Sequence, residues 1–141
     1  MNSFIEISDI KKACETLKKV VINSPFQKIS SYSNIYKSNI FFKREDLQNV
    51  RSFKIRGAFN KISALDKNQT KNGLVCASAG NHAQGFAVSC STLGYKGIVF
   101  MPTKTPNQKI QQVKKFGKNN IEVILFGENF TQAYEKALEE C

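Results

Sequence analysis

Residues 74–85 read LVCASAGNHAQG, four apolar residues followed at once by small and polar ones. A short apolar run without alternation is typical of a strand that is covered on both faces. Ala83, Gly85 and Ala87 are small enough for a following helix to pack closely on a sheet. We therefore predict a buried strand over residues 74–77 that leads through a tight turn into a helix.

Two further apolar runs follow at nearly equal intervals. Residues 98–101 and 121–126 start 24 and 23 residues after the preceding run (74 to 98, then 98 to 121), and each interval has room for a helix. Thr105-Pro106 with Gln108 has the composition of a helix start, and Gly117 can end that helix. This spacing predicts parallel βαβ units and the α/β class.

A last helix is expected after Asn129. Its apolar residues recur at helical spacing up to the end of the chain: Phe130, Ala133, Tyr134, Ala137, Leu138 and Cys141. Because this stripe reaches the last residue without a capping residue, we expect the natural domain to be longer than these 141 residues.

The residues before the first buried strand indicate two helices and a short strand. An amphipathic helix over 8–23 ends at Ser24-Pro25, a loop follows, and residues 40–43 have the composition of a strand. A helix is expected over 53–65. Between them, residues 43–46 read KRED, which we interpret as a structural ion-pair cluster rather than a catalytic pair of acids.

Length and charge set limits on the kind of protein. The chain is long enough for one modest domain and has a formal net charge of +10, but only three of its 21 basic residues are Arg: Arg44, Arg51 and Arg56. Scattered Lys is more typical of a solvated surface than of a nucleic-acid-binding face. No apolar run is long enough for a membrane helix, and the first residues lack a signal-type apolar core. We expect a cytoplasmic protein with neither a membrane nor a nucleic acid as partner.

The cysteines do not predict a metal site. Cys14, Cys76, Cys90 and Cys141 form no C-x-x-C pair, and His82 is the one histidine of the chain. We interpret Cys76 and Cys90 as buried free thiols, since both lie in apolar segments.

The first candidate site is the turn at residues 78–82. Backbone N–H groups at a helix start, together with the helix dipole, favour an anion. Gly80 lets a ligand approach the backbone, Ser78 can cap the helix or bind a carboxylate, and Asn81 offers an amide donor and acceptor. A capped helix start with nothing bound explains the same residues equally well. His82 at a helix start is more often structural than catalytic.

The second candidate is Lys54, in SFKIRGA at residues 52–58. Burial between apolar neighbours and a helix start both favour the neutral amine that Schiff-base chemistry requires. From the local residues alone, the alternative is favoured: a lysine whose stem packs on the sheet while its head reaches water.

Three motifs in order carry a family resemblance. FKREDLQ at 42–48, SFKIRGA at 52–58 and SAGNHAQG at 78–85 together resemble the threonine/serine dehydratase and serine racemase group of fold-type II pyridoxal-phosphate enzymes, most closely the biosynthetic threonine dehydratases. The resemblance covers nearly the whole chain from about Ser24. It implies an incomplete three-layer αβα fold with a parallel sheet, in which residues 1–53 open the larger cofactor-binding domain and residues 54–141 form most of the smaller βαβ domain, truncated in its last helix.

The resemblance also implies roles for matching positions. Lys54 is expected to bind pyridoxal 5'-phosphate as a Schiff base and to move the α-proton. Phe53 is expected beside the cofactor ring, and Asn81 as a donor to its 3′ oxygen. Ser78, Ala79, Gly80 and His82 are expected to bind the carboxylate of the amino-acid substrate.

The implied reaction is deamination of L-threonine or L-serine to a 2-oxo acid and ammonia, as in isoleucine biosynthesis. Full-length relatives are expected to be homo-oligomers. In this family a glycine-rich loop holds the cofactor phosphate, and the eight glycines of this chain are all isolated. Three alternatives stay open: a non-catalytic remnant or split-gene half, a serine racemase-like activity, and an anion-binding module.

Overall fold

A three-stranded parallel sheet forms the centre of the molecule. The computed structural model describes residues 4–141. Strands β3 (Leu74–Ala77), β4 (Gly97–Met101) and β5 (Ile121–Leu125) lie in the order β3-β4-β5, with Leu74 opposite Gly97 and Gly97 opposite Ile121. The predicted strands are confirmed to within one residue at each end.

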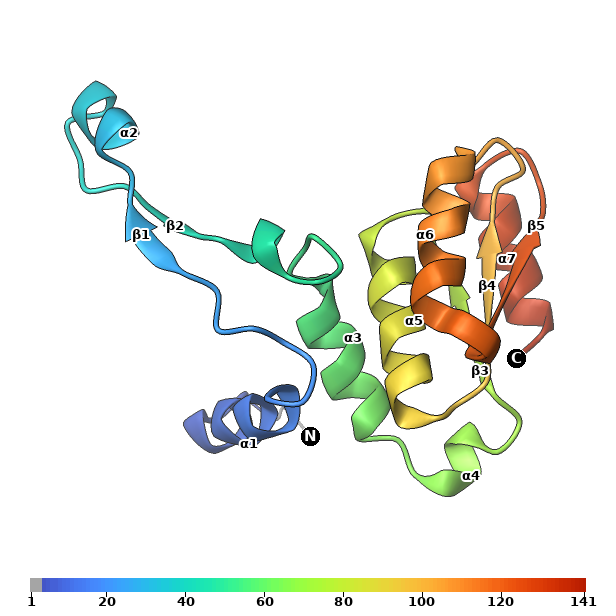
Figure 1. Cartoon of the computed structure of the whole chain (residues 1–141). Helices are drawn as coiled ribbons and strands as arrows, with labels where there is room; N and C mark the ends of the chain where they lie inside the picture. Colours follow the sequence, from blue (N-terminus) through green and yellow to red (C-terminus); the bar gives the residue numbers. More distant parts are fainter. Residues whose placement is uncertain (1–3) are drawn as a thin grey trace.

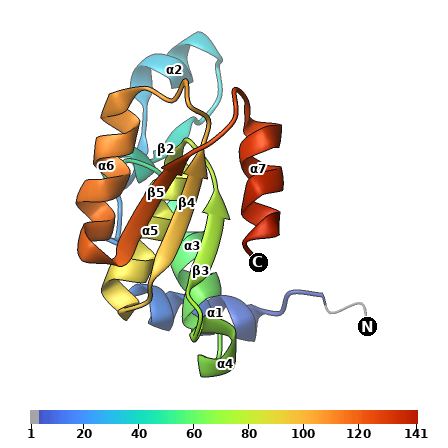
Figure 2. The same ribbon diagram turned by 90° about the vertical axis from the view of Figure 1, so that its right-hand side faces the viewer.

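Helices cover both faces of this sheet, as Figure 2 shows. Helices α5 (Asn81–Leu93) and α6 (Asn107–Gly117) lie on one face, and α7 (Phe130–Glu139) lies on the other. Side chains of β4 alternate accordingly: Val99 and Met101 pack with α5 and α6, whereas Phe100 packs with Ala133 and Ala137 of α7. The chain therefore has the three αβα layers, with a parallel sheet, that were expected from the sequence.

A second layer of helices joins the N-terminal part to this body. Helix α3 (Lys54–Ser63) packs along α5, and α1 (Ile7–Leu17) packs on α3, where Leu17, Val50, Ile55 and Phe59 form a second apolar cluster. The short helix α4 (Lys67–Thr70) precedes β3. Helix α1 ends six residues before the predicted residue 23, because the amide of Gln48 binds both the N–H (3.0 Å) and the carbonyl (2.9 Å) of Ile22.

An arm projects from the body, as Figure 1 shows. Strands β1 (Phe26–Lys28) and β2 (Phe41–Lys43) pair antiparallel, and the short helix α2 (Ser30–Ile35) connects them. The sequence predicted a loop over the first strand and α2. The arm exposes several large apolar side chains, among them Phe26 (67% exposed) and Tyr36 (65%).

Two predicted helix details were wrong. The side chain of Thr105 does not cap α6; it is buried and its hydroxyl has no partner, and the helix begins after Pro106. In α7, Asn129 caps the helix by accepting from the N–H of Gln132 at 3.1 Å, but of the predicted stripe only Ala133 and Ala137 are buried. Only these two small residues face the sheet closely, so Phe130, Tyr134 and Leu138 stay about half exposed.

None of the helices within residues 4–141 has both the length and the apolar character needed to cross a membrane.

Candidate active site

The turn at residues 78–80 lies at the carboxyl end of β3 and is held by Ser78. The N–H of Ser78 donates to the carbonyl of Phe100 at 3.1 Å, which ties the turn to β4. The hydroxyl of Ser78 accepts from the N–H groups of Gly80 and Ala83, each at 3.3 Å. Ser78 therefore caps the start of the helix, which is one of the two roles that the sequence allowed.

The space in front of this turn is open. A Cβ placed on Gly80 would have no heavy atom within 4 Å. Asn81 and His82 occupy the first two positions of α5, so no helical carbonyl can accept from their N–H groups. The start of this 13-residue helix thus presents free donors and a positive dipole end to an accessible space, which suits an anionic group such as a carboxylate.

Lys54 is the first residue of α3, and its side chain is exposed. Its Nζ lies 5.3 Å from the ring centroid of Phe53, whose side chain is 60% exposed. The local residues favoured a lysine whose head reaches water, and the exposed side chain agrees with that interpretation; Phe53 lies beside the amine but is itself largely in solvent. Consequently the amine of Lys54 is accessible to molecules from solution.

The packing of α3 on α5 brings Lys54 and the turn together. Gly85 of α5 lies directly against the backbone of Lys54, so the lysine stands beside the first turns of α5. Partial burial of the imidazole lowers the pKa of His82, and the positive charge of Lys54 lowers it further. His82 also lines a small hollow of about 230 Å³ between α3, α5 and the edge of β3.

The KRED segment forms the structural cluster that the sequence predicted. Glu45 accepts two hydrogen bonds from the guanidinium of Arg56, both at 2.8 Å, and a further one from the hydroxyl of Ser24. The guanidinium of Arg56 holds the pKa of Glu45 at about 2. Arg44 and Asp46 form a separate, more exposed pair at 2.7 Å. These contacts join the arm to α3.

The cysteines also fit their predicted roles. Cys76 and Cys90 are buried, and burial raises the pKa of each thiol to about 12. Neither can serve as a nucleophile at neutral pH. In the part of the chain that the structure describes, no group of three or more His, Cys, Asp or Glu side chains could hold a metal ion.

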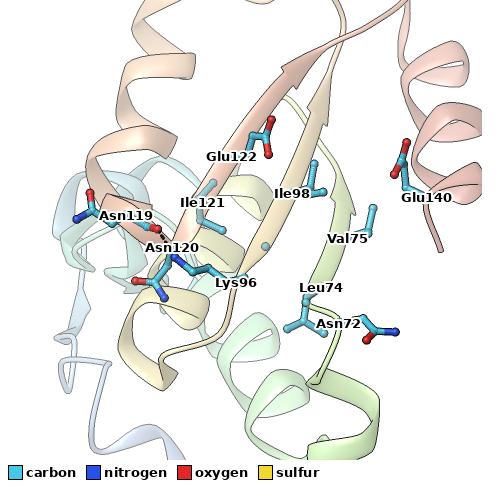
Figure 3. A pocket seen from close by; sticks show the side chains of 12 residues that line it. Asn72, Leu74, Val75, Lys96, Ile98, Asn119, Asn120, Ile121, Glu122 and Glu140 are labelled. Carbon is cyan, nitrogen blue, oxygen red and sulfur yellow. Dashed lines mark hydrogen bonds between the residues drawn. The ribbon is translucent and has the colours of Figure 1, made fainter.

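A larger hollow of about 480 Å³ lies at the amino ends of the strands, where Figure 3 shows it. Lys96 donates to the carbonyl of Asn119 at 2.8 Å on one side of this hollow, and Glu140, the residue after α7, stands on the other. Because ligands of open α/β sheets bind at the carboxyl ends of strands, this hollow lies at the wrong end for the chemistry of Lys54.

The residues that are present fit the aldehyde-bearing ring of pyridoxal phosphate. The accessible amine of Lys54 could bind the cofactor covalently, exposed Phe53 could lie beside its ring, and the open turn before α5 could receive a carboxylate. No two of the chain's eight glycines are adjacent, so these residues do not include a glycine-rich cradle for the phosphate.

Comparison with known proteins agrees with this geometry. Residues 17–141 match the family of pyridoxal-phosphate dependent enzymes, and the chain belongs to that family. It is 53% identical over 140 residues to the biosynthetic L-threonine dehydratase of Bacillus subtilis, and 56% identical over 135 residues to that of Halalkalibacterium halodurans. These matches cover 99% and 96% of the chain but only 33% and 32% of the relatives. The chain thus spans about a third of the length of the curated relatives it matches.

Solved structures give the same result. The processed form of threonine deaminase isoform 2 from Solanum lycopersicum superposes with a TM-score of 0.82 at 34% identity, over 99% of this chain and 39% of that one. Maize serine racemase superposes with a TM-score of 0.85 at 30% identity, over 96% of this chain and 41% of that one. Dehydratases and racemases therefore share this part of the fold.

Proposed function

We propose that this chain carries the lysine-bearing part of a pyridoxal-phosphate dependent ammonia-lyase that deaminates L-threonine or L-serine to 2-oxobutanoate or pyruvate. The observation that carries the proposal is the position of Lys54, an accessible amine beside the open helix start of α5. About half of the chain's residues are identical to biosynthetic threonine dehydratases, which supports the substrate class.

In this proposal each site residue has a task. Lys54 would hold the cofactor covalently until the substrate amine displaces it, and would then move the proton at the substrate α-carbon; Phe53 would pack beside the ring. When bound, the cofactor supplies the electron sink for the bond that breaks at that carbon. Asn81 would donate to the 3′ oxygen that the cofactor ring carries. The substrate carboxylate lies at the start of α5, where it meets Ser78, Ala79, Gly80 and His82.

The same proposal includes the domains, the compartment, the partners and the oligomeric state of the protein. Residues 1–53 belong to the larger cofactor domain and residues 54–141 to the smaller one. The protein acts in the cytoplasm, in amino-acid biosynthesis, on a small substrate and without a nucleic acid or membrane partner. Its full-length form is a homo-oligomer.

Racemisation of serine is the second candidate function. The observation in its favour is the TM-score of 0.85 to maize serine racemase. The two reactions differ in what happens after the α-proton leaves: a racemase returns a proton to the opposite face, whereas a dehydratase releases the β-hydroxyl. Formation of D-serine without 2-oxo acid would favour the racemase.

A trapping experiment tests the role of Lys54 without requiring turnover. The purified chain is mixed with pyridoxal phosphate, reduced with borohydride and mapped by peptide mass spectrometry. We expect the pyridoxyl group mainly on Lys54, and none at that position in Lys54→Ala. Lys61→Ala, at another exposed lysine of α3, is the matched control and should keep the label. Label spread evenly over surface lysines would contradict the proposal.

A further inference from the structure

The two candidate segments approach each other closely at Gly85. A Cβ built on this glycine would lie 3.2 Å from both the carbonyl carbon and the carbonyl oxygen of Lys54, and 3.3 Å from the Cβ of Ala58. These distances are tighter than most contacts of a real Cβ, so one added carbon would push α3 and α5 apart by a few tenths of an ångström. The absence of a side chain at residue 85 therefore lets helix α5 lie this close to the backbone of Lys54.

The face of helix α5 that lies on the sheet is tightly packed, so α5 itself cannot shift easily. Ala83 and Ala87, on either side of Gly85 in sequence, are completely buried against the sheet cluster. The hydroxyl of Ser89, also fully buried, donates to the carbonyl of Gly85 at 2.7 Å. Because packed interiors leave little free volume, a side chain at residue 85 would displace the start of α3 more readily than α5.

The start of α3 carries Lys54, so its position determines where the proposed cofactor lysine lies. Residues 81 and 82 lie within about one helical turn of Gly85, so the contact at Gly85 sets the distance between the proposed carboxylate turn and the proposed cofactor lysine. We propose that Gly85 is a positioning residue, which fixes the backbone of Lys54 relative to the start of α5. This inference rests on the proposed function for its chemical meaning, although the contact itself does not.

Gly57 provides a matched control on α3. A Cβ placed on Gly57 would have no heavy atom within 4 Å, so Gly57→Ala adds the same carbon close to Lys54 without crowding. Alanine also favours a helix interior over glycine, so this control should be at least as stable as the parent chain. Comparing Gly85→Ala with Gly57→Ala separates crowding at Lys54 from the effect of adding a methyl group.

The experiment measures two properties of the 141-residue chain. The first is the rate at which pyridoxal phosphate is trapped on Lys54 by borohydride. We expect Gly85→Ala to slow it about tenfold, since small misplacements of reacting groups can cost up to about a hundredfold. The second is the pKa of His82, followed by NMR. It should rise in Gly85→Ala, because a wider gap between the helices weakens both the burial of the imidazole and the influence of Lys54.

The outcomes separate this inference from the proposed function. Equal trapping rates and equal His82 titration in Gly85→Ala and Gly57→Ala would overturn the positioning role, even if Gly85→Ala melts at a lower temperature. If the parent chain fails to trap the cofactor on Lys54, the proposed function fails, and the His82 titration still decides the inference.

A second variant covers the case in which Gly85→Ala does not fold. Combining it with Ala58→Gly removes one of the crowded contacts and keeps the crowding against the carbonyl of Lys54. The same two measurements then apply: changed values support the positioning role, and values like those of the parent chain overturn it.

Discussion

Lys54 and His82 come from different helices, and the charge of Lys54 affects His82 through space. The chain has one histidine, so a single imidazole reports on the surroundings of the lysine. Burial is the larger cause of the lowered pKa of His82, and the charge of Lys54 is the second. The two causes can therefore be separated by removing the charge alone.

Lys54→Met is the variant that removes this charge while keeping a long side chain. We expect the pKa of His82 to rise in this variant but to stay below its ordinary value of about 6.5, because burial of the imidazole remains. An NMR titration of the imidazole protons measures it. Lys61→Met is the control, since Lys61 lines the same hollow as His82 but does not contribute to the shift. An unchanged pKa in Lys54→Met would show that the two side chains lie farther apart.

The sequence predicted which residues are candidates for the site better than it predicted what surrounds their side chains. Lys54 and the turn at 78–82 could be named as candidates because their motifs are local, while their roles stay predictions. The exposed head of Lys54 agrees with the interpretation that the local residues favoured, but the exposure of Phe53 beside it left no signal in the sequence. The contact of Gly85 with Lys54 depends on how α3 crosses α5, which the sequence does not specify; a glycine among Ala83 and Ala87 was the only signal.

Glu45 and Arg56 form the polar connection between the arm and α3, which is called the joint below. Glu45 stands in the short 3-10 helix after β2 (Glu45–Leu47) and binds Arg56 of α3 through two parallel hydrogen bonds. The side chain of Glu45 is only 16% exposed, so solvent screens this pair less than an ordinary surface pair.

The joint should make stability depend on pH in the acid range. The pKa of Glu45 is depressed in the folded chain from 4.5 to about 2. Its contribution is therefore fully present above about pH 4.5 and is lost as the pH falls through about 2. We expect Glu45→Gln to lower the free energy of unfolding at pH 7 by about 1–3 kcal/mol and to reduce the loss on acidification. Urea unfolding across this pH range measures both.

Asp46→Asn is the control for this prediction. Asp46 pairs with Arg44 in a more exposed position, with 56% of its side chain accessible, so its removal should cost less than about 1 kcal/mol. Equal losses in the two variants would show that the joint contributes no more than a surface ion pair.

Elements with local signals were predictable and those that depend on distant contacts were not. The strands β3, β4 and β5 follow from apolar runs at regular spacing. The end of α1 does not, because Gln48, 26 residues away, binds Ile22. The pairing of β1 with β2 across α2 likewise leaves little trace in short strands whose side chains are all exposed.

The molecule as a whole exposes much apolar surface for its size. Large side chains on the arm and on the outer side of α7 are 40–70% exposed, including Ile35, Phe26 and Phe130. Such surfaces are usually covered by another part of a protein. The relatives are about three times as long as the region that matches, which supplies the candidate for that cover.

We therefore expect the 141-residue chain alone to show no turnover of L-threonine above background. The proposed function gives Lys54 the aldehyde of the cofactor, but no two glycines of the chain are adjacent to form a cradle for its phosphate. A coupled assay for 2-oxobutanoate measures the activity. The comparison sample contains the same chain mixed with the remaining two-thirds of the Bacillus subtilis relative. Turnover by the 141 residues alone would contradict this expectation.

The order β3-β4-β5 has a consequence for how the protein is made. Each strand pairs with the one that follows it in the chain, so every pairing in the sheet closes a loop of a single helix and its turns. No strand of this sheet has to wait for a distant partner, and domains generally assemble from the N-terminal side during synthesis. The strands of the βαβ body can therefore pair in the order in which they are translated.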